Sequence, residues 1–125
     1  MKPLHFVGSA QKDLRSFPED ARQEAGYAFY LAQAGGKGIN AVPMVGFGGA
    51  GVLEVVIDHD GDTYRAVYSV KFKGAVYVLH AFQKKSKKGI KTPQAELNII
   101  AARLKAAKEH HEKTYGGTEE KHGKA

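Results

Sequence analysis

The spacing of hydrophobic residues changes along the chain, and each change predicts a different kind of element. Residues 3–8 form a short apolar run that ends at a glycine, which is typical of a strand. Residues 9–15 and 16–33 carry apolar side chains at helical spacing, and the pair Gly35-Gly36 ends the second segment. We therefore expect an N-terminal strand followed by a helical hairpin.

Three runs further along the chain favour strands, because β-branched and aromatic residues dominate them. They cover residues 52–57, 64–72 and 76–82. The first two runs are joined by a turn with the Asp60-Gly61 signal of a hairpin, and the last two by a short glycine turn. The pattern predicts an antiparallel β-meander.

Cap signals indicate where the two longer helices begin. Ser16 and Glu19 have the spacing of a capping box, and Thr92 precedes a proline at the expected first turn of a C-terminal helix. Apolar residues repeat at helical spacing after Thr92 and predict a face that packs on the sheet. They are Leu97, Ile100, Ala101 and Leu104.

The order of elements predicts an α+β fold, with a small antiparallel sheet and helices on one face. A glycine-rich connection over residues 35–51 joins the helical hairpin to the meander. We find no repeat and no long linker, so we expect a single domain over residues 1–112. The polar composition of residues 113–125 predicts a disordered C-terminal tail.

Positive charge is concentrated in one part of the chain. The sequence has 125 residues and a formal net charge of +6, and its segment 63–95 contains basic residues but no carboxylate. The basic residues of this segment are Arg65, Lys71, Lys73, Lys84, Lys85, Lys87, Lys88 and Lys91. A folded surface usually mixes charges of both signs, so the segment predicts a polyanionic partner such as RNA or DNA.

Composition argues against several other kinds of site. The chain has no cysteine, which excludes disulfides, thiolate metal sites and cysteine nucleophiles. No apolar run has the length of a signal peptide or a membrane span, which favours a cytoplasmic protein. Asp58, Asp60 and Asp62 lack the glycine and glutamate positions of a calcium loop, and the adjacent His110 and His111 diverge on a helix. We therefore expect neither a metal nor another cofactor.

Strand periodicity allows two environments for Arg65. Alternate side chains point to opposite faces, so Arg65 and Lys71 are expected on the same face of their strand. A buried arginine needs a partner, so Arg65 either pairs with Glu54 across the hairpin or lines an open anion-binding groove. Glu54 is accordingly either that partner, which we favour, or a general base. His80 shares an apolar strand face with Val78 and is predicted to be a core histidine with satisfied hydrogen bonds.

Three segments of the chain resemble the motifs of one family in order and spacing. They are Thr63-Tyr64-Arg65-Ala66-Val67-Tyr68, Val78-Leu79-His80-Ala81-Phe82-Gln83-Lys84-Lys85-Ser86 and Lys91-Thr92-Pro93-Gln94-Ala95-Glu96. Through them, residues 3–108 resemble the RelE/ParE toxin superfamily, and most closely its phage-derived, HigB-like branch. The chain departs from some relatives, which carry lysines where Leu53-Glu54-Val55 stands here.

The resemblance implies the toxin of a type II toxin–antitoxin system. Such toxins are metal-independent endoribonucleases that cut mRNA, commonly on the ribosome, and thereby inhibit translation. The implied partner is a cognate antitoxin, usually a helix-turn-helix DNA-binding protein, and the complex binds operator DNA. Two alternatives remain open: a non-catalytic toxin of the same fold that inhibits DNA gyrase, and a simple nucleic-acid-binding module.

The resemblance also implies roles for the basic residues. Arg65 corresponds to a strand arginine that contacts the scissile phosphate, and Lys84 and Lys85 correspond to a basic pair that ends the last strand. Lys85 is the expected transition-state stabiliser or proton donor. The expected RNA-binding residues are Lys71, Lys73, Lys87, Lys88 and Lys91. No general base is assigned, because Tyr115 and the pair His110-His111 are expected to lie too far beyond the last packed turn to match the family.

Overall fold

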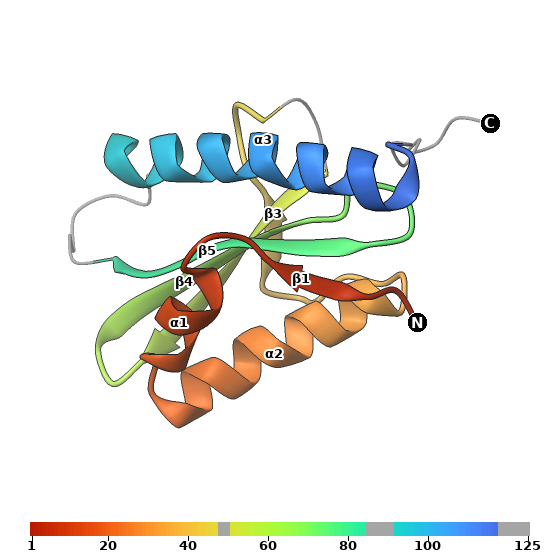
Figure 1. The fold of residues 1–125 in the computed structure, drawn as a ribbon. Coiled ribbons are helices and arrows are strands. Elements are labelled where there is room, and N and C mark those ends of the chain that lie inside the picture. The colour runs from red at the N-terminus through yellow and green to blue at the C-terminus, as the bar shows by residue number, and fades with distance from the viewer. Residues whose placement is uncertain (48–50, 85–91, 118–125) are drawn as a thin grey trace.

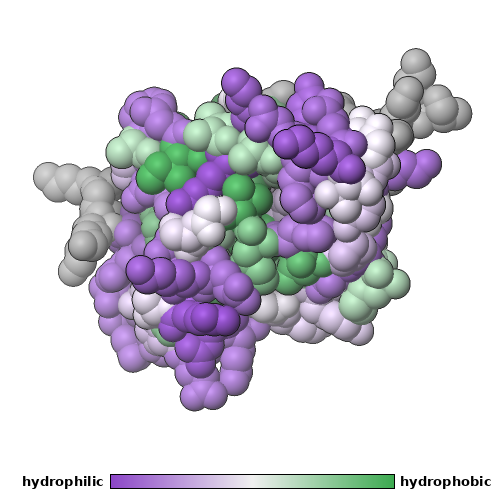
Figure 2. All heavy atoms as spheres, viewed as in Figure 1, coloured by the Kyte–Doolittle hydropathy of each residue, from purple (hydrophilic) through white to green (hydrophobic). Residues whose placement is uncertain are grey.

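The computed structural model describes residues 1–47, 51–84 and 92–117, and in them a five-stranded sheet lies between helices (Figure 1). The elements are β1 (Leu4–Phe6), α1 (Ala10–Arg15), α2 (Glu19–Gln33), β2 (Ala41–Pro43), β3 (Val52–His59), β4 (Asp62–Ser69), β5 (Val76–Lys84) and α3 (Gln94–Tyr115). Hydrophilic residues cover much of the face shown in Figure 2, with smaller hydrophobic patches between them. No helix in the described ranges combines the length and apolarity that a membrane crossing requires.

The sheet is mixed, with the strand order β1-β5-β4-β3-β2. β1 runs parallel to β5, whereas the other neighbouring strands are antiparallel. The predicted meander and the α+β class are confirmed. The expectation of a purely antiparallel sheet with helices on one face was wrong, because α1 and α2 cover one face and α3 covers the other (Figure 1). Nearly every residue of β5 is buried, so both of its faces need a cover.

Two hydrophobic cores lie on opposite faces of the sheet. α2 packs on one face through Ala21, Ala25 and Ala28, whose small side chains let the helix approach the strands closely. α3 covers the other face, where Ile100 and Ala107 are fully buried. Polar side chains of the strands that point toward α3 are therefore enclosed between a helix and a sheet.

A bulge in β5 determines which side chains face α3. Val67 pairs with His80 and Tyr68 pairs with Val78, so Leu79 is an extra residue in β5. Val78 belongs to the core under α2, while Leu79 belongs to the core under α3 and His80 bonds to α3. The simple alternation that placed Val78 and His80 on the same face was therefore wrong.

Neither predicted side-chain cap forms. α2 begins after Pro18, and Ser16 Oγ instead donates a hydrogen bond to the carbonyl oxygen of Asp13. α3 begins after Pro93, and the hydroxyl of Thr92 donates to a glutamate of β3. Each proline has an extended backbone, with ψ of 150°, and occupies the cap position itself, so the polar residue before it lies outside the helix.

Two stretches contain secondary structure that the sequence patterns did not predict. Ala41–Pro43, within the glycine-rich connection, forms the edge strand β2 on β3. α3 continues to Tyr115, beyond the boundary at residue 112 that composition predicts. His111 is 1% exposed, and the Tyr115 hydroxyl lies 2.7 Å from His5 Nε2. The last turns of α3 are thus packed on the sheet, contrary to our expectation for Tyr115.

Candidate anion-binding site

A buried ion pair joins β3 and β4. Arg65 lies opposite Val56, which places Glu54 diagonally across from it on the same face. Arg65 Nη1 and Glu54 Oε1 are 3.0 Å apart, and each residue is 6% exposed. The second carboxylate oxygen, Oε2, accepts a hydrogen bond of 2.9 Å from Thr92 Oγ1. The predicted Arg65–Glu54 pair is therefore confirmed, and Thr92 joins it in place of its predicted role as a helix cap.

Lys84 brings a second cation to this pair. It follows two residues after Phe82, which pairs with Arg65, so Lys84 lies diagonally across from Arg65 on the same face. Lys84 is 8% exposed. Burial lowers the pKa of the Lys84 ammonium below its usual range, the nearby Arg65 charge lowers it further, and Glu54 acts in the opposite direction.

We call four of these residues the Arg65 cluster: Arg65, Lys84, Glu54 and Thr92. Their side chains include two cations and one carboxylate. Like charges that are held away from water repel strongly, because the protein interior screens them poorly. A phosphate oxygen near Arg65 and Lys84 would be attracted by both cations. The planar guanidinium and the ammonium would also donate hydrogen bonds to it. The cluster is therefore chemically suited to bind an oxyanion and to stabilise negative charge that develops on it.

A cleft of about 650 Å³ opens beside the Arg65 cluster. Glu54 and Thr92 line the cleft and also belong to the cluster. Among the described residues, the others that line it are Pro43, Met44, Val45, Pro93, Gln94 and Leu97. These come from the end of β2 and the start of α3, so a ligand in the cleft would lie next to the buried charges.

The structure brings together only some of the predicted site residues. Arg65 and Lys84 are neighbours, but Lys71 and Lys73 lie past the other end of β4, roughly 20 Å from Arg65 along an extended chain. The carbonyl oxygen of Lys73 accepts a hydrogen bond of 2.8 Å from His111, near the C-terminal end of α3. Lys85, Lys87, Lys88 and Lys91 lie outside the described residues.

His80 has the satisfied hydrogen bonds that were predicted for it. His80 Nε2 lies 2.7 Å from Glu96 Oε1, and Arg103 Nη1 lies 3.3 Å from His80 Nδ1. A guanidinium only donates, so Nδ1 is the acceptor and Nε2 carries the proton that bonds to Glu96. Arg103 also donates to the carbonyl oxygen of Leu79 and to the hydroxyl of Ser9. This network ties α3 to β5 and to the start of α1, which favours a structural role.

The C-terminal end of α3 holds a group of rings that sequence reasoning missed: His5, Tyr77, His110, His111 and Tyr115, here called the His5 cluster. The rings of His5 and Tyr77 stack with centroids 5.0 Å apart, and the Tyr77 hydroxyl lies 2.7 Å from His110 Nδ1. Burial lowers the pKa of His5, and His110 and His111 lower it further. The rings come from β1, β5 and α3, so no local motif signals them. Across the described part of the chain, no three or more histidine or acidic side chains are arranged to hold a metal ion.

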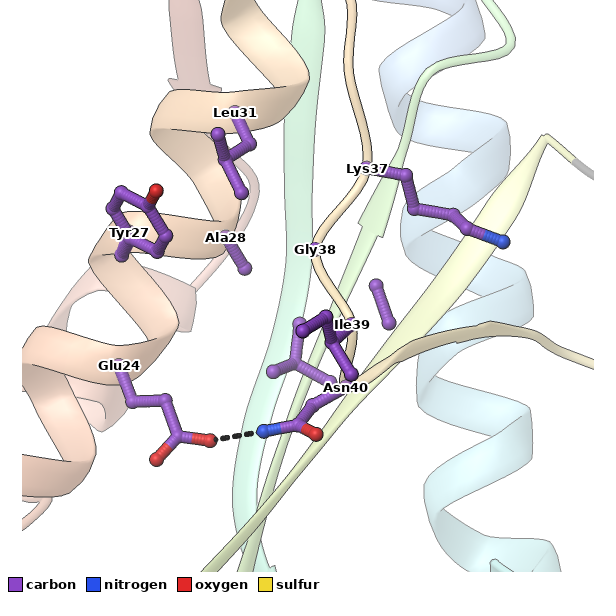
Figure 3. A pocket seen from close by; sticks show the side chains of 10 residues that line it. Glu24, Tyr27, Ala28, Leu31, Lys37, Gly38, Ile39 and Asn40 are labelled. Atoms are coloured by element: carbon purple, nitrogen blue, oxygen red, sulfur yellow. Dashed lines mark hydrogen bonds between the residues drawn. The ribbon is translucent and has the colours of Figure 1, made fainter.

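A second pocket, of about 310 Å³, lies on the opposite side of the sheet, between α2 and the segment that leads to β2 (Figure 3). Tyr27 and Leu31 of α2 line it, and Asn40 Nδ2 donates a hydrogen bond of 2.7 Å to Glu24. Lys37 is the one cation among the described lining residues, and Figure 3 shows its side chain directed away from α2. This pocket therefore lacks the paired cations of the Arg65 cluster.

The part of the chain that contains the Arg65 cluster matches the model of a known family. The family model described as "Phage derived protein Gp49-like (DUF891)" matches residues 12–105 of the chain. The chain belongs to this phage-derived Gp49-like family. The match contains β3, β4, β5 and the start of α3, and with them every residue of the Arg65 cluster.

Among solved structures, the Gp49-like chain is similar to an arginine-to-alanine double mutant of the E. coli toxin RelE in the free state. The two chains are 16% identical with a TM-score of 0.54, over 84% of this chain and 96% of that chain. At this identity the similarity shows the fold. A comparison with curated proteins gives no match. Family and fold together support the RelE-like toxin superfamily, while the HigB-like branch stays a prediction.

Proposed function

We propose that this Gp49-like protein is the toxin of a type II toxin–antitoxin system and cleaves ribosome-bound mRNA without a metal, which inhibits translation. The observation that supports a nuclease most directly is the Arg65 cluster, in which two buried cations lie on one face of the sheet beside an open cleft. An RNA phosphate supplies the anion that this arrangement favours. Membership in the Gp49-like family and the RelE fold support the toxin part of the proposal.

The proposed reaction uses the RNA's own 2′-hydroxyl as nucleophile. Its oxygen attacks the adjacent phosphorus, the bond to the 5′-oxygen of the next nucleotide breaks, and that oxygen takes up a proton. Negative charge accumulates on the phosphorus oxygens during the attack. Arg65 and Lys84 stabilise this charge through hydrogen bonds, and they do so more strongly in a buried site than in water.

Lys84 is suited to the proton transfer as well. A lysine of ordinary pKa is a weak acid near neutral pH, and the lowered pKa of Lys84 makes its ammonium a better proton donor to the leaving 5′-oxygen. Lys85, which the family resemblance favours for this role, is the next residue in the chain and lies outside the described residues. Glu54 either orients Arg65 or also accepts the proton of the 2′-hydroxyl, and its contacts with Arg65 and Thr92 favour the orienting role.

The proposal includes a cognate antitoxin, a helix-turn-helix DNA-binding protein that meets the toxin in the cytoplasm and binds operator DNA in complex with it. The antitoxin covers the side of the Arg65 cluster or blocks entry to the ribosome. Lys71 and Lys73 lie too far from Arg65 to share its phosphate, so we assign them to the backbone of mRNA or ribosomal RNA. Lys87, Lys88 and Lys91 have the same proposed role.

The burial of the Arg65–Glu54 pair favours one alternative. An ion pair with this little exposure can serve the fold alone, as it would in a non-catalytic toxin of the same fold that inhibits DNA gyrase. Lys84 argues for the nuclease, because it places a second cationic hydrogen-bond donor beside Arg65, where both can contact one phosphate. A simple nucleic-acid-binding module is the third candidate and would not arrest growth.

Induced expression followed by mapping of mRNA 5′ ends tests these candidates. A nuclease arrests growth and creates new 5′ ends, whereas a gyrase inhibitor arrests growth with damaged DNA and intact mRNA. Lys84→Met is the informative variant, because it removes the ammonium and leaves the Arg65–Glu54 pair in place. Lys108→Met, at an exposed position of α3, is the matched control. Undiminished mRNA cleavage by Lys84→Met at equal protein level would contradict the assignment of the site.

A further inference from the structure

The last part of α3 is held on the sheet by polar rings instead of apolar side chains. The buried residues of this helix are Ile100, Ala107 and His111. Residues 108–115, which form about two helical turns, therefore have a histidine where a packed helix usually has an apolar residue. The attachment of these turns depends on the chemistry of imidazoles.

The side-chain hydrogen bonds described between this segment and the sheet or its turns each include an imidazole. They join Tyr115 Oη to His5 Nε2 at 2.7 Å, His110 Nδ1 to Tyr77 Oη at 2.7 Å, and His111 Nε2 to the carbonyl oxygen of Lys73 at 2.8 Å. The end of α3 thus lies on the side of the molecule where β1 begins (Figure 1). Uptake of protons by these imidazoles would change the charge of the contacts themselves.

His111 is poorly placed to carry a positive charge. Its Nε2 donates to a carbonyl oxygen, so Nδ1 is the nitrogen without a proton in the neutral ring. Nδ1 has no hydrogen-bond partner among the described residues, and His111 is 1% exposed. A proton on Nδ1 would bury a charge and an N–H group without an acceptor, which is strongly disfavoured. Water would solvate both if the segment left the sheet.

The imidazoles also repel one another once they are charged. The ring centroids of His5 and His110 are 4.8 Å apart. Burial lowers the pKa of His5, and His110 and His111 lower it further. Attached turns therefore bind fewer protons than detached turns. By linkage, attachment is complete above the ordinary value of 6.5 and is lost as the pH falls through the lowered pKa of His5.

The surrounding charges do not offset this repulsion. Among the described residues no carboxylate forms an ion pair with these three imidazoles, whereas His59 lies 3.3 Å from Asp60 and His80 lies 2.7 Å from Glu96. The charged residues at neighbouring positions of β1, the β4–β5 connection and α3 are Lys2, Lys71, Lys73, Lys108, Glu109, Glu112 and Lys113. Lysines predominate, and both glutamates are exposed. The negative end of the helix dipole acts mainly within the last turn, after the two histidines of α3.

We propose that the His5 cluster is an acid-released latch, which holds residues 108–115 on the sheet at neutral pH and lets them detach on acidification while the rest of the fold persists. The first half of α3 stays in place, because Ile100 is fully buried and Arg103 donates to the carbonyl oxygen of Leu79 and to Ser9. This inference goes beyond the proposed nuclease and does not depend on it.

Amide hydrogen exchange of the full chain tests the latch between about pH 7.5 and pH 5, the range in which histidines titrate. Protection factors, which correct for the pH dependence of chemical exchange, should fall for residues 108–115 by up to about tenfold per pH unit for each proton taken up. Amides of β4 and of the first half of α3 should keep their protection, as expected for local opening. NMR signals of the His5 and His111 rings should titrate at the same pH.

Two variants assign the effect to the imidazoles. The double variant His5→Phe with His110→Gln removes two of the titrating rings and keeps an aromatic ring beside Tyr77, so the loss of protection on acidification should be smaller. His59→Gln, in the turn between β3 and β4, is the matched control and should retain the response of the wild type.

Three results would overturn the latch. One is protection of residues 108–115 that stays constant while the rings of His5 and His111 titrate to completion in the wild-type protein. Another is a loss of protection that occurs equally in β4, because the whole fold would then be opening. The third is a double variant that keeps the full response of the wild type.

Discussion

The two ends of α3 enclose polar clusters that are built in opposite ways. At the N-terminal end, Arg65 pairs with the carboxylate of Glu54, and Lys84 lies on the same face of the sheet near both, beside a cleft. At the C-terminal end, roughly 25 Å away along the helix axis, the rings of the His5 cluster bond to one another. The first cluster gathers two cations next to open space, whereas the rings of the second pack and bond across β1, β5 and α3 and hold α3 on the sheet.

The difference shows how a buried polar cluster can be judged. Both clusters are enclosed by the same helix, so burial by itself does not separate a binding site from a structural contact. Cations gathered next to open space favour a ligand, and mutual hydrogen bonding between packed rings favours stability. The variants below test this distinction by changing one end of α3 and using the other as reference.

Removal of the Arg65 side chain is expected to have the largest effect on stability. Arg65→Ala leaves the buried Glu54 carboxylate without its guanidinium, which lowers the free energy of unfolding by about 3–5 kcal/mol in comparable sites. Urea-induced unfolding measures the loss. The double variant Arg65→Met with Glu54→Leu removes both charges and should recover most of the stability.

If Arg65→Ala had the same midpoint of urea-induced unfolding as the wild type, the Arg65–Glu54 pair would not stabilise the folded protein. The expected loss also changes how toxicity is interpreted. Arg65→Ala is not expected to leave the fold intact, because Arg65 is 6% exposed. Relief of toxicity in this variant has meaning only at matched amounts of folded protein.

Removal of the Lys84 ammonium is expected to affect catalysis more than stability. Lys84→Met should lower the rate of RNA cleavage about 100-fold, as loss of one transition-state donor usually does. The free energy of unfolding should change little, because repulsion from Arg65 is relieved together with the attraction to Glu54. Single-turnover cleavage of an oligoribonucleotide measures the rate. His110→Gln, in the His5 cluster, is the reference and should cleave RNA at the wild-type rate. An equal loss of cleavage rate in both variants would contradict the distinction between the two ends of α3.

The Thr92 hydroxyl is expected to stabilise the N-terminal cluster by a smaller amount. Thr92→Val removes a hydrogen bond to a charged carboxylate, and such bonds contribute about 1.5–3 kcal/mol. Thr92→Ser keeps the hydroxyl and should retain most of the stability, which thermal unfolding can measure. Thr92→Asn, which would suit a helix cap, should not restore it. Equal stability of the valine and serine variants would exclude Thr92 from the cluster.

The smallest expected effect is a loss of stability on acidification that comes from the His5 cluster. The pKa of His5 is lower in the folded protein than the ordinary value of 6.5, so the folded state binds fewer protons than the unfolded state. The contribution of His5 to stability is therefore fully present above pH 6.5 and is lost as the pH falls through the lowered pKa. Unfolding free energies between pH 7.5 and pH 5 (roughly the range where histidines titrate) measure it.

His5→Phe is the control for this pH dependence. It keeps an aromatic ring beside Tyr77 and removes the group that titrates, so part of the acid-dependent loss should disappear. The Arg65 cluster contains no histidine, so Lys84→Met should keep the full acid-dependent loss of the wild type. A pH dependence that is unchanged in His5→Phe would assign the effect to another part of the molecule.

The sequence alone was sufficient to predict the features that depend on residues close together in the chain. The Asp60-Gly61 turn and the two-residue period of strands set the pairing of β3 with β4, and this pairing brings Glu54 to Arg65. The buried face of α3 followed from helical spacing in the same way, apart from Ala101, which is exposed. The α+β class and the RelE-like fold followed from these elements and from their motifs.

Tertiary structure alone decided the features that join distant segments. The parallel pairing of β1 with β5, the bulge at Leu79, the bond from Thr92 to Glu54 and the His5 cluster have no local signal. Each depends on how α3 and the helical hairpin pack on opposite faces of the sheet. Turn geometry and periodicity act between residues close in sequence, whereas packing and charge act between residues close in space. For that reason the sequence named Arg65, Glu54 and Lys84 as candidates, and only the folded chain brings Thr92 and a cleft to them.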